Sequence, residues 1–195
     1  MNRQDEQNDV LRDVVTRLDR LKIGYMLTGS MALVHYAIPR TTVDIDMVLA
    51  IRPSDVDRFI SAFDGDYYVP HGRVREAVLT RRMFNILNQK TILKVDCVVL
   101  KDNEFQQSVF RRRHRVSYSG DFDVWIITKE DLILSKLLWA KESRSEKQML
   151  DVASLIRNPY DTDYSESWTQ RLGVSQLLNE CRELLEKNYA DGYDS

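Results

Sequence analysis

The chain has 195 residues, of which 43% are hydrophobic and 30% are charged, so it carries enough apolar material for the core of a globular domain. A net charge of −2 excludes a histone-like or supercharged protein. The longest uncharged run, residues 23–39, is too polar to span a membrane, and the polar residues 1–10 do not fit a secretory signal. Because each of the two cysteines stands alone, we expect a cytoplasmic protein with reduced thiols, without a disulfide scaffold or a structural zinc site.

The charge is distributed unevenly along the chain. Residues 71–115 contain eleven Lys and Arg against four Asp and Glu, whereas residues 158–195 contain three against eight. The middle segment therefore carries +7 and the C-terminal segment −5. This polarity indicates an anionic partner for the middle segment.

The first part of the chain alternates helical and strand patterns. Residues 8–21 repeat apolar side chains at helical spacing and predict an amphipathic helix. A short strand over residues 25–28 ends at Gly29-Ser30, and a short apolar helix follows. Residues 43–51 alternate apolar and polar side chains and predict the clearest strand. Pro53 then opens another helix.

The second part begins with strands and ends with helices. Thr128, with Asp131 three residues later, is a capping-box signal for the first of the C-terminal helices. The remaining patterns predict strands over residues 84–87, 91–100, 115–118 and 123–127, and helices over residues 104–113 and 146–157 and along the C-terminus. We therefore expect an α/β (α+β) fold, with a mixed β-sheet core flanked by helices over residues 1–127 and a helical part packed on it over residues 128–195.

Three acidic residues on predicted strands are the strongest chemical signal. Asp44 and Asp46 lie two residues apart on one strand, so their side chains leave the same face. Asp96 lies within the apolar strand ILKVDCVVL, where an acid is costly unless it is paired or binds a metal. Together the three carboxylates could hold divalent ions and deprotonate a hydroxyl. The alternatives are a solvated strand face for Asp44 and Asp46, and a Lys or Arg partner for Asp96.

Gly29-Ser30 precedes these acids at the end of a strand, where backbone N–H groups and a hydroxyl can bind an anion. The segment TGSMALVHYAIPRTTVDIDMVL resembles the signature of the DNA polymerase beta-like nucleotidyltransferase superfamily, which is Gly-Ser, then Asp-x-Asp on the next strand, then a third acid on a later strand. The likeness covers roughly residues 25–100. The later segment EDLILSKLLWAKESRSEKQMLDVASLI is similar to the helices after the sheet in small bacterial AbiE-type and related enzymes, although residues 145–148 depart from their Asp-x-Lys-Asp element.

This resemblance implies transfer of a nucleoside monophosphate from an NTP, such as ATP, to an acceptor hydroxyl, with release of pyrophosphate. It implies that Asp44 and Asp46 bind two Mg²⁺ ions, with Mn²⁺ as a substitute. Asp96 would bind one of these ions and activate the acceptor hydroxyl. Gly29 and Ser30 would hold the triphosphate.

Two cations are candidates for further contacts with the triphosphate. Arg40 precedes the Asp-x-Asp strand and could bind a phosphate in a bidentate manner, or it could be an ordinary loop residue. Lys136 has apolar neighbours on its helix, so it either extends its ammonium to solvent or meets a specific anion. The family resemblance implies that this anion is the triphosphate. The basic run over residues 111–115 could bind an RNA acceptor or form a solvated helix end.

The acceptor is open at this level: tRNA or other RNA, a protein, and a small molecule all fit. The chain could act in a toxin–antitoxin module, with a cognate antitoxin as a partner protein, and no membrane contact is expected. The alternative is a non-catalytic nucleotide- or protein-binding module, such as an antitoxin or sensor, on the same fold. The intact set of acids favours the enzyme.

Overall fold

The computed structural model describes residues 3–37 and 44–190 of the chain. It divides into two compact units, of which the first comprises Met1–Ala32 and Thr41–Ile127 and the second Leu33–Arg40 and Thr128–Ser195. Within the described ranges, no helix is both long enough and apolar enough to cross a lipid bilayer.

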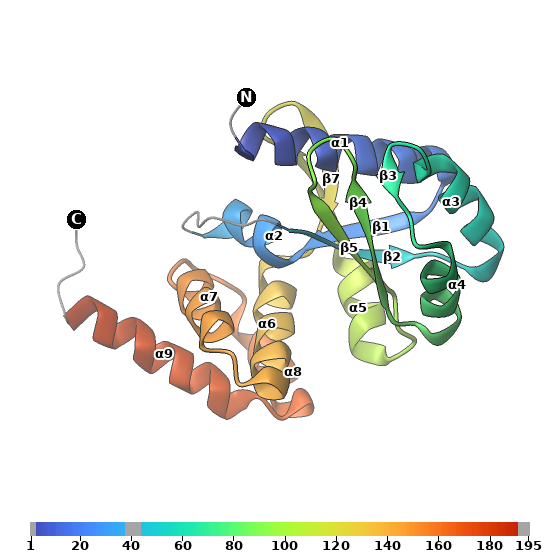
Figure 1. The fold of residues 1–195 in the computed structure, drawn as a ribbon. Coiled ribbons are helices and arrows are strands. Elements are labelled where there is room, and N and C mark those ends of the chain that lie inside the picture. Colours follow the sequence, from blue (N-terminus) through green and yellow to red (C-terminus); the bar gives the residue numbers. More distant parts are fainter. Residues whose placement is uncertain (1–2, 38–43, 191–195) are drawn as a thin grey trace. The chain divides into compact units, whose positions relative to one another are not determined.

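The first unit contains a mixed β-sheet (Figure 1), as predicted. In the part of the chain that the structure describes, its strand order is β3-β4-β5-β2-β1-β7-β6. The strands are β1 (Gly24–Thr28), β2 (Ile45–Ala50), β3 (Tyr67–Tyr68), β4 (Met83–Asn88), β5 (Lys94–Val99), β6 (His114–Tyr118) and β7 (Phe122–Ile126). Strand β2 pairs parallel with β5 and antiparallel with β1, which pairs parallel with β7. These pairings place β1, β2 and β5 at the centre of the sheet.

The helices of both units follow the apolar periodicity of the sequence where that periodicity is strong. Helix α1 buries one apolar stripe and packs against β1 and α3, while α4 packs against β4. In the second unit, α6 packs against α7 and α8, and α9 packs against α7. The helices are α1 (Arg3–Leu21), α2 (Gly29–Tyr36), the 3₁₀ turn η1 (Pro53–Asp55), α3 (Val56–Phe63), α4 (His71–Thr80), α5 (Glu104–Arg112), α6 (Lys129–Ser143), α7 (Glu146–Ile156), α8 (Thr162–Leu172) and α9 (Ser175–Ala190).

Helices α4 and α8 were not among the predicted elements. Helix α8 buries Ser165, Trp168 and Thr169, so two of its three buried side chains are polar and leave no apolar period to detect. Helix α4 is short and buries only Val74, Ala77 and Val78. Both segments are helical because of their packing within the unit, although their sequences show no clear apolar period.

The connection between β4 and β5 is longer than the gap between the strands predicted over residues 84–87 and 91–100. Strand β4 ends at Asn88 and β5 begins at Lys94. The Asn88 side-chain oxygen accepts hydrogen bonds from the backbone N–H groups of Lys90 and Thr91, and Ile92 adopts a left-handed backbone with φ 57°. The Asn88 side chain thus holds a wider loop closed, a common role for asparagine in turns.

The capping signal at the start of the second unit is confirmed. The Thr128 hydroxyl accepts a hydrogen bond from the Asp131 backbone N–H at 3.3 Å and donates one to the Asp131 carboxylate at 2.7 Å. Tyr164 on α8 donates a further hydrogen bond to Asp131 at 2.6 Å. The N-terminal cap of α6 therefore also holds α8 in place.

The Asp55 carboxylate is expected to stabilise the first unit in a pH-dependent manner. Its buried carboxylate accepts hydrogen bonds from Arg52 and Arg58, and the Arg52 hydrogen bond is the main cause that lowers the Asp55 pKa, against the opposing effect of burial. Because the pKa is lower in the folded chain than in the unfolded one, this stabilisation is complete above about pH 4 and is lost as the pH falls through the folded value.

We expect Asp55→Asn to lower the free energy of unfolding by about 1–2 kcal/mol at pH 7 and by less near pH 3. Urea unfolding at both pH values measures the difference. Asp57→Asn is the matched control, because Asp57 lies on the same segment but is exposed in its pair with Arg75. An equal loss at both pH values would contradict the assignment.

Candidate active site

Two of the predicted acids face each other across neighbouring parallel strands. Asp46 on β2 is in register with Asp96 on β5, so both side chains leave the same face of the sheet. Ile45 and Met47 on the opposite face of β2 are fully buried, which fixes the orientation of the strand. Asp96 is also buried, whereas Asp44, directly before β2, is half-exposed. The sheet therefore presents a carboxylate pair, with Asp44 at its edge.

Gly29 closes one side of this carboxylate pair. Thr28, the last residue of β1, is in register with Asp46, so the turn from β1 into α2 lies beside the Asp46 side chain. Gly29 has a left-handed φ of 63°, and a methyl group there would come within 2.6 Å of the Asp46 Cβ and closer still to its carboxylate. Only glycine allows this close approach. Ser30 follows, half-buried, at the start of α2.

Lys94 lies among the acids. Its Nζ is 2.9 Å from Asp96 Oδ2 and 3.7 Å from Asp44 Oδ2. The hydrogen bond with Asp96 raises the Lys94 pKa most, the charges of Asp96, Asp44 and Asp46 raise it further, and burial opposes them. Asp96 thus has the Lys partner that the sequence offered as an alternative. The available signal for Lys94 is its position two residues before Asp96, on the same face of the strand.

The carboxylate pair fits a magnesium ion in its chemistry. Asp96 Oδ1 is buried without a hydrogen-bond partner, so one oxygen of this carboxylate is unsatisfied. Mg²⁺ takes oxygen ligands and is commonly held by one or two protein carboxylates, with water and phosphate completing its shell. Among the residues that the structure describes, no three acidic, His or Cys side chains are grouped to hold an ion. The arrangement therefore matches a site built from the Asp46–Asp96 pair and the phosphates of a substrate.

Asn85 continues the polar row beyond Asp96 and was not among the predicted site residues. It lies on β4 in register with Asp96, is exposed, and leaves the same face of the sheet. Thr28, Asp46, Asp96 and Asn85 therefore form one row of polar side chains across β1, β2, β5 and β4. The sequence shows that Asn85 is a polar residue at an alternating position of an apolar strand. It does not show that Asn85 is aligned with Asp96, because that depends on the strand register.

The two predicted phosphate-binding cations have different outcomes. Arg40 lies outside the described residues, so its role stays a prediction. Lys136 on α6 is buried, and its Nζ donates hydrogen bonds to Asp151 Oδ2 at 2.8 Å and Gln148 Oε1 at 3.1 Å, both on α7. The specific anion that Lys136 meets within its unit is therefore Asp151.

Several arginines of the basic segment are engaged in contacts within the first unit. Arg113 donates to the Phe110 carbonyl and lies over the Phe110 ring, 3.9 Å from its centroid. Arg115 pairs with Asp123 and Arg81 pairs with Asp102. Within the basic run over residues 111–115, Arg113 and Arg115 therefore have partners inside the first unit.

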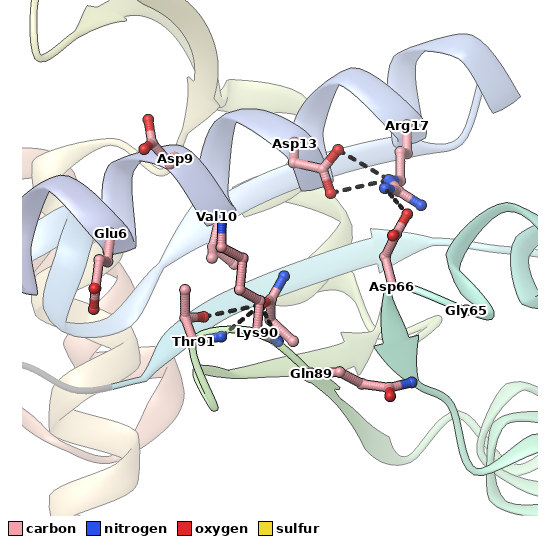
Figure 2. A pocket seen from close by; sticks show the side chains of 11 residues that line it. Glu6, Asp9, Val10, Asp13, Arg17, Gly65, Asp66, Gln89, Lys90 and Thr91 are labelled. Carbon is pink, nitrogen blue, oxygen red and sulfur yellow. Dashed lines mark hydrogen bonds and ion pairs between the residues drawn. The ribbon is translucent and has the colours of Figure 1, made fainter.

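A separate cavity of about 600 Å³ opens between α1 and the β4–β5 loop (Figure 2). Its polar wall includes Arg17, which pairs with Asp13 at 2.9 Å and Asp66 at 2.6 Å. None of the predicted site residues lines it. Arg17 here ties α1 to the turn before β3, which is a structural role.

A family model described as "Nucleotidyltransferase of unknown function (DUF6036)" matches residues 6–166. The chain belongs to this family. The match spans the sheet, the Asp46–Asp96 pair and the helices as far as the first part of α8, and it confirms the resemblance to nucleotidyltransferases.

Among solved structures, one with a TM-score above 0.5 shares the fold of this chain. The antigenic nucleotidyltransferase-like protein from Paracoccidioides brasiliensis is 19% identical with a TM-score of 0.56, and the alignment covers 96% of this chain and 90% of that chain. The antibiotic-resistance factor ANT(2'')-Ia is 15% identical, with coverages of 97% and 94% and a TM-score of 0.46. JHP933 from Helicobacter pylori is 14% identical, with coverages of 94% and 94% and a TM-score of 0.47. No curated protein matches the chain.

Proposed function

We propose that this protein transfers a nucleoside monophosphate from an NTP to an acceptor hydroxyl and releases pyrophosphate. The observation that carries the proposal is the in-register Asp46–Asp96 pair, with the Gly29 turn pressed against Asp46. This arrangement combines paired carboxylates with backbone N–H groups at the start of a helix. A nucleoside triphosphate together with Mg²⁺ has the charges that complement both features.

Each residue of the site has a distinct role in this reaction. The backbone around Gly29 and the Ser30 hydroxyl bind the triphosphate. The Asp96 carboxylate, whose Oδ1 has no hydrogen-bond partner within the protein, accepts the proton of the acceptor hydroxyl. The acceptor oxygen then bonds to the α-phosphorus while the bond to the bridging oxygen of pyrophosphate breaks. Positioning of these groups in line is the main contribution of the protein.

Asp46 and Asp96, with Asp44 at the edge, would hold Mg²⁺, or Mn²⁺ in its place, and a second ion would be shared with the phosphates. Bound metal would neutralise the charge that develops on the triphosphate during displacement. The face of β4 around Asn85 lies beyond Asp96, on the side away from Gly29. We assign the acceptor to that side, because the nucleotide occupies the Gly29 side.

We expect Asp46→Asn and Asp96→Asn each to reduce transfer by about 100-fold or more, since each removes a carboxylate charge from the reacting centre. The assay incubates the protein and Mg²⁺ with each α-labelled NTP and, separately, with RNA, protein and small-molecule fractions of a cell lysate. The fraction that gains the label identifies the acceptor class.

Asp123→Asn is the matched control, because Asp123 is also a strand aspartate in an ion pair, with Arg115 on β6, but lies outside the site. It should transfer label at the wild-type rate. Unchanged transfer in both Asp46→Asn and Asp96→Asn would disprove the assignment. Binding of Mg·NTP without transfer to any fraction would favour the non-catalytic nucleotide-binding alternative, which the Lys94–Asp96 pair also suits.

A further inference from the structure

We infer that Lys94 is an internal counter-ion that holds the cation position between the acids in the nucleotide-free protein. When Mg²⁺ arrives with the nucleotide, the ammonium leaves the carboxylates for the phosphates. Metal binding is thereby coupled to nucleotide binding. The movement of Lys94 to a nucleotide rests on the proposed function. The competition between Lys94 and the metal does not depend on it.

The position of the ammonium carries the argument. Lys94 and Asp96 are two residues apart on β5 and share a face, and the Lys94 Nζ is within 4 Å of oxygens from both Asp96 and Asp44. An ion bound to the same oxygens would lie close to the ammonium, because Mg–O bonds are about 2.1 Å long. Two cations that close repel strongly in a partly buried site. Metal and ammonium therefore compete for the same carboxylates.

The two partners differ in their freedom to move. The Asp96 side chain is 13% exposed and anchored on a central strand, so it stays in place. The Lys94 side chain is 39% exposed on a flexible stem, so it can turn toward solvent without opening the core. Asp96 Oδ1, buried beside it, has no hydrogen-bond partner. The site can exchange a lysine for a metal by a side-chain movement alone.

A bound nucleotide would give the displaced Lys94 ammonium new anionic partners, which makes metal binding more favourable. A displaced ammonium beside a triphosphate gains anionic partners, and lysine binds phosphate as a compact point charge. Without the nucleotide, the same displacement leaves Lys94 next to a bound dication with no new partner. Metal should therefore bind weakly to the free protein and tightly in the presence of the nucleotide.

The test measures Mn²⁺ binding by electron paramagnetic resonance, with Mn²⁺ alone and with Mn²⁺ plus a non-hydrolysable NTP analogue. We expect Lys94→Met, which keeps the length of the stem and removes the charge, to bind Mn²⁺ alone about tenfold more tightly than the wild type. The analogue should then strengthen Mn²⁺ binding less in this variant than in the wild type. Lys94→Arg should behave like the wild type, because it keeps the charge.

Lys90→Met is the matched control, since Lys90 is an exposed lysine on the loop that leads into β5, and the Mn²⁺ affinity of this variant should not change. If Lys94→Met is less stable than the wild type because Asp96 loses its partner, Mn²⁺ should raise its melting temperature more than that of the wild type. Unchanged or weaker binding of Mn²⁺ alone to Lys94→Met would overturn the inference. Tighter Mn²⁺ binding to Lys94→Met, together with no nucleotidyl transfer by the wild type, would reject the proposed reaction and support the counter-ion role.

Discussion

Gly29→Ala is expected to abolish nucleotidyl transfer and to destabilise the first unit. An alanine at φ 63° carries a backbone penalty of about 1–2 kcal/mol. Its methyl group would also overlap the Asp46 side chain, including the Cβ, which cannot rotate away. The chain must therefore shift either the β1–α2 turn or β2, and both movements misplace Asp46 relative to Asp96.

The variant Gly120→Ala separates the cost of the left-handed backbone from the effect of the overlap with Asp46. Gly120 also has a left-handed φ, of 73°, but no atom lies within 4 Å of the position that its methyl group would occupy. It should lose about 1 kcal/mol of unfolding free energy and keep full activity. Urea unfolding and the label-transfer assay, applied to both variants, measure the difference. Equal activity in the two alanine variants would show that the Gly29 turn does not position Asp46 for the reaction.

Loss of one partner of the buried Lys136–Asp151 ion pair is expected to lower the stability of the second unit strongly. Both side chains are only 4% exposed, so a variant that removes one partner leaves a buried charge without compensation. We expect Lys136→Met or Asp151→Leu alone to lower the unfolding free energy by about 3–5 kcal/mol. The double variant should recover most of this loss, because two apolar side chains can fill the space without a charge.

A urea-unfolding double-mutant cycle measures this coupling directly. Additive losses in the double variant would contradict a structural ion pair. The double variant also tests the role that the family resemblance implies for Lys136. Its NTP affinity, measured in the folded protein, will show whether the ammonium also reaches a triphosphate, because stability no longer obscures the comparison.

Local patterns were sufficient for much of the fold and for part of the site. The alternation along β2 predicted that Asp46 would face away from Ile45 and Met47, and the structure confirms this. The Thr128 cap was visible because its hydrogen bonds join residues three positions apart. Such features depend on neighbours along the chain, so they are predictable without knowledge of the tertiary structure.

Other features could not be predicted from the sequence, because they depend on which segments pack together in the folded chain. Helix α8 was not predicted because it buries polar side chains. The β4–β5 connection is longer than the gap between the predicted strands because the Asn88 side chain closes a wider loop. The function of Lys94 was not visible either, although its shared face with Asp96 was. Its distance to Asp44 depends on the parallel pairing of β5 with β2.

The amino-acid sequence by itself determined the three acids, the Gly29-Ser30 turn and the faces that they occupy, because side-chain direction along a strand is a local property. Only the tertiary structure decided that Asp46 is in register with Asp96, that Lys94 neutralises the acids and that Lys136 pairs with Asp151. These relations join residues that are distant in sequence or on different elements. Strand register and helix packing determine them, and both are set by burial of the apolar faces as a whole.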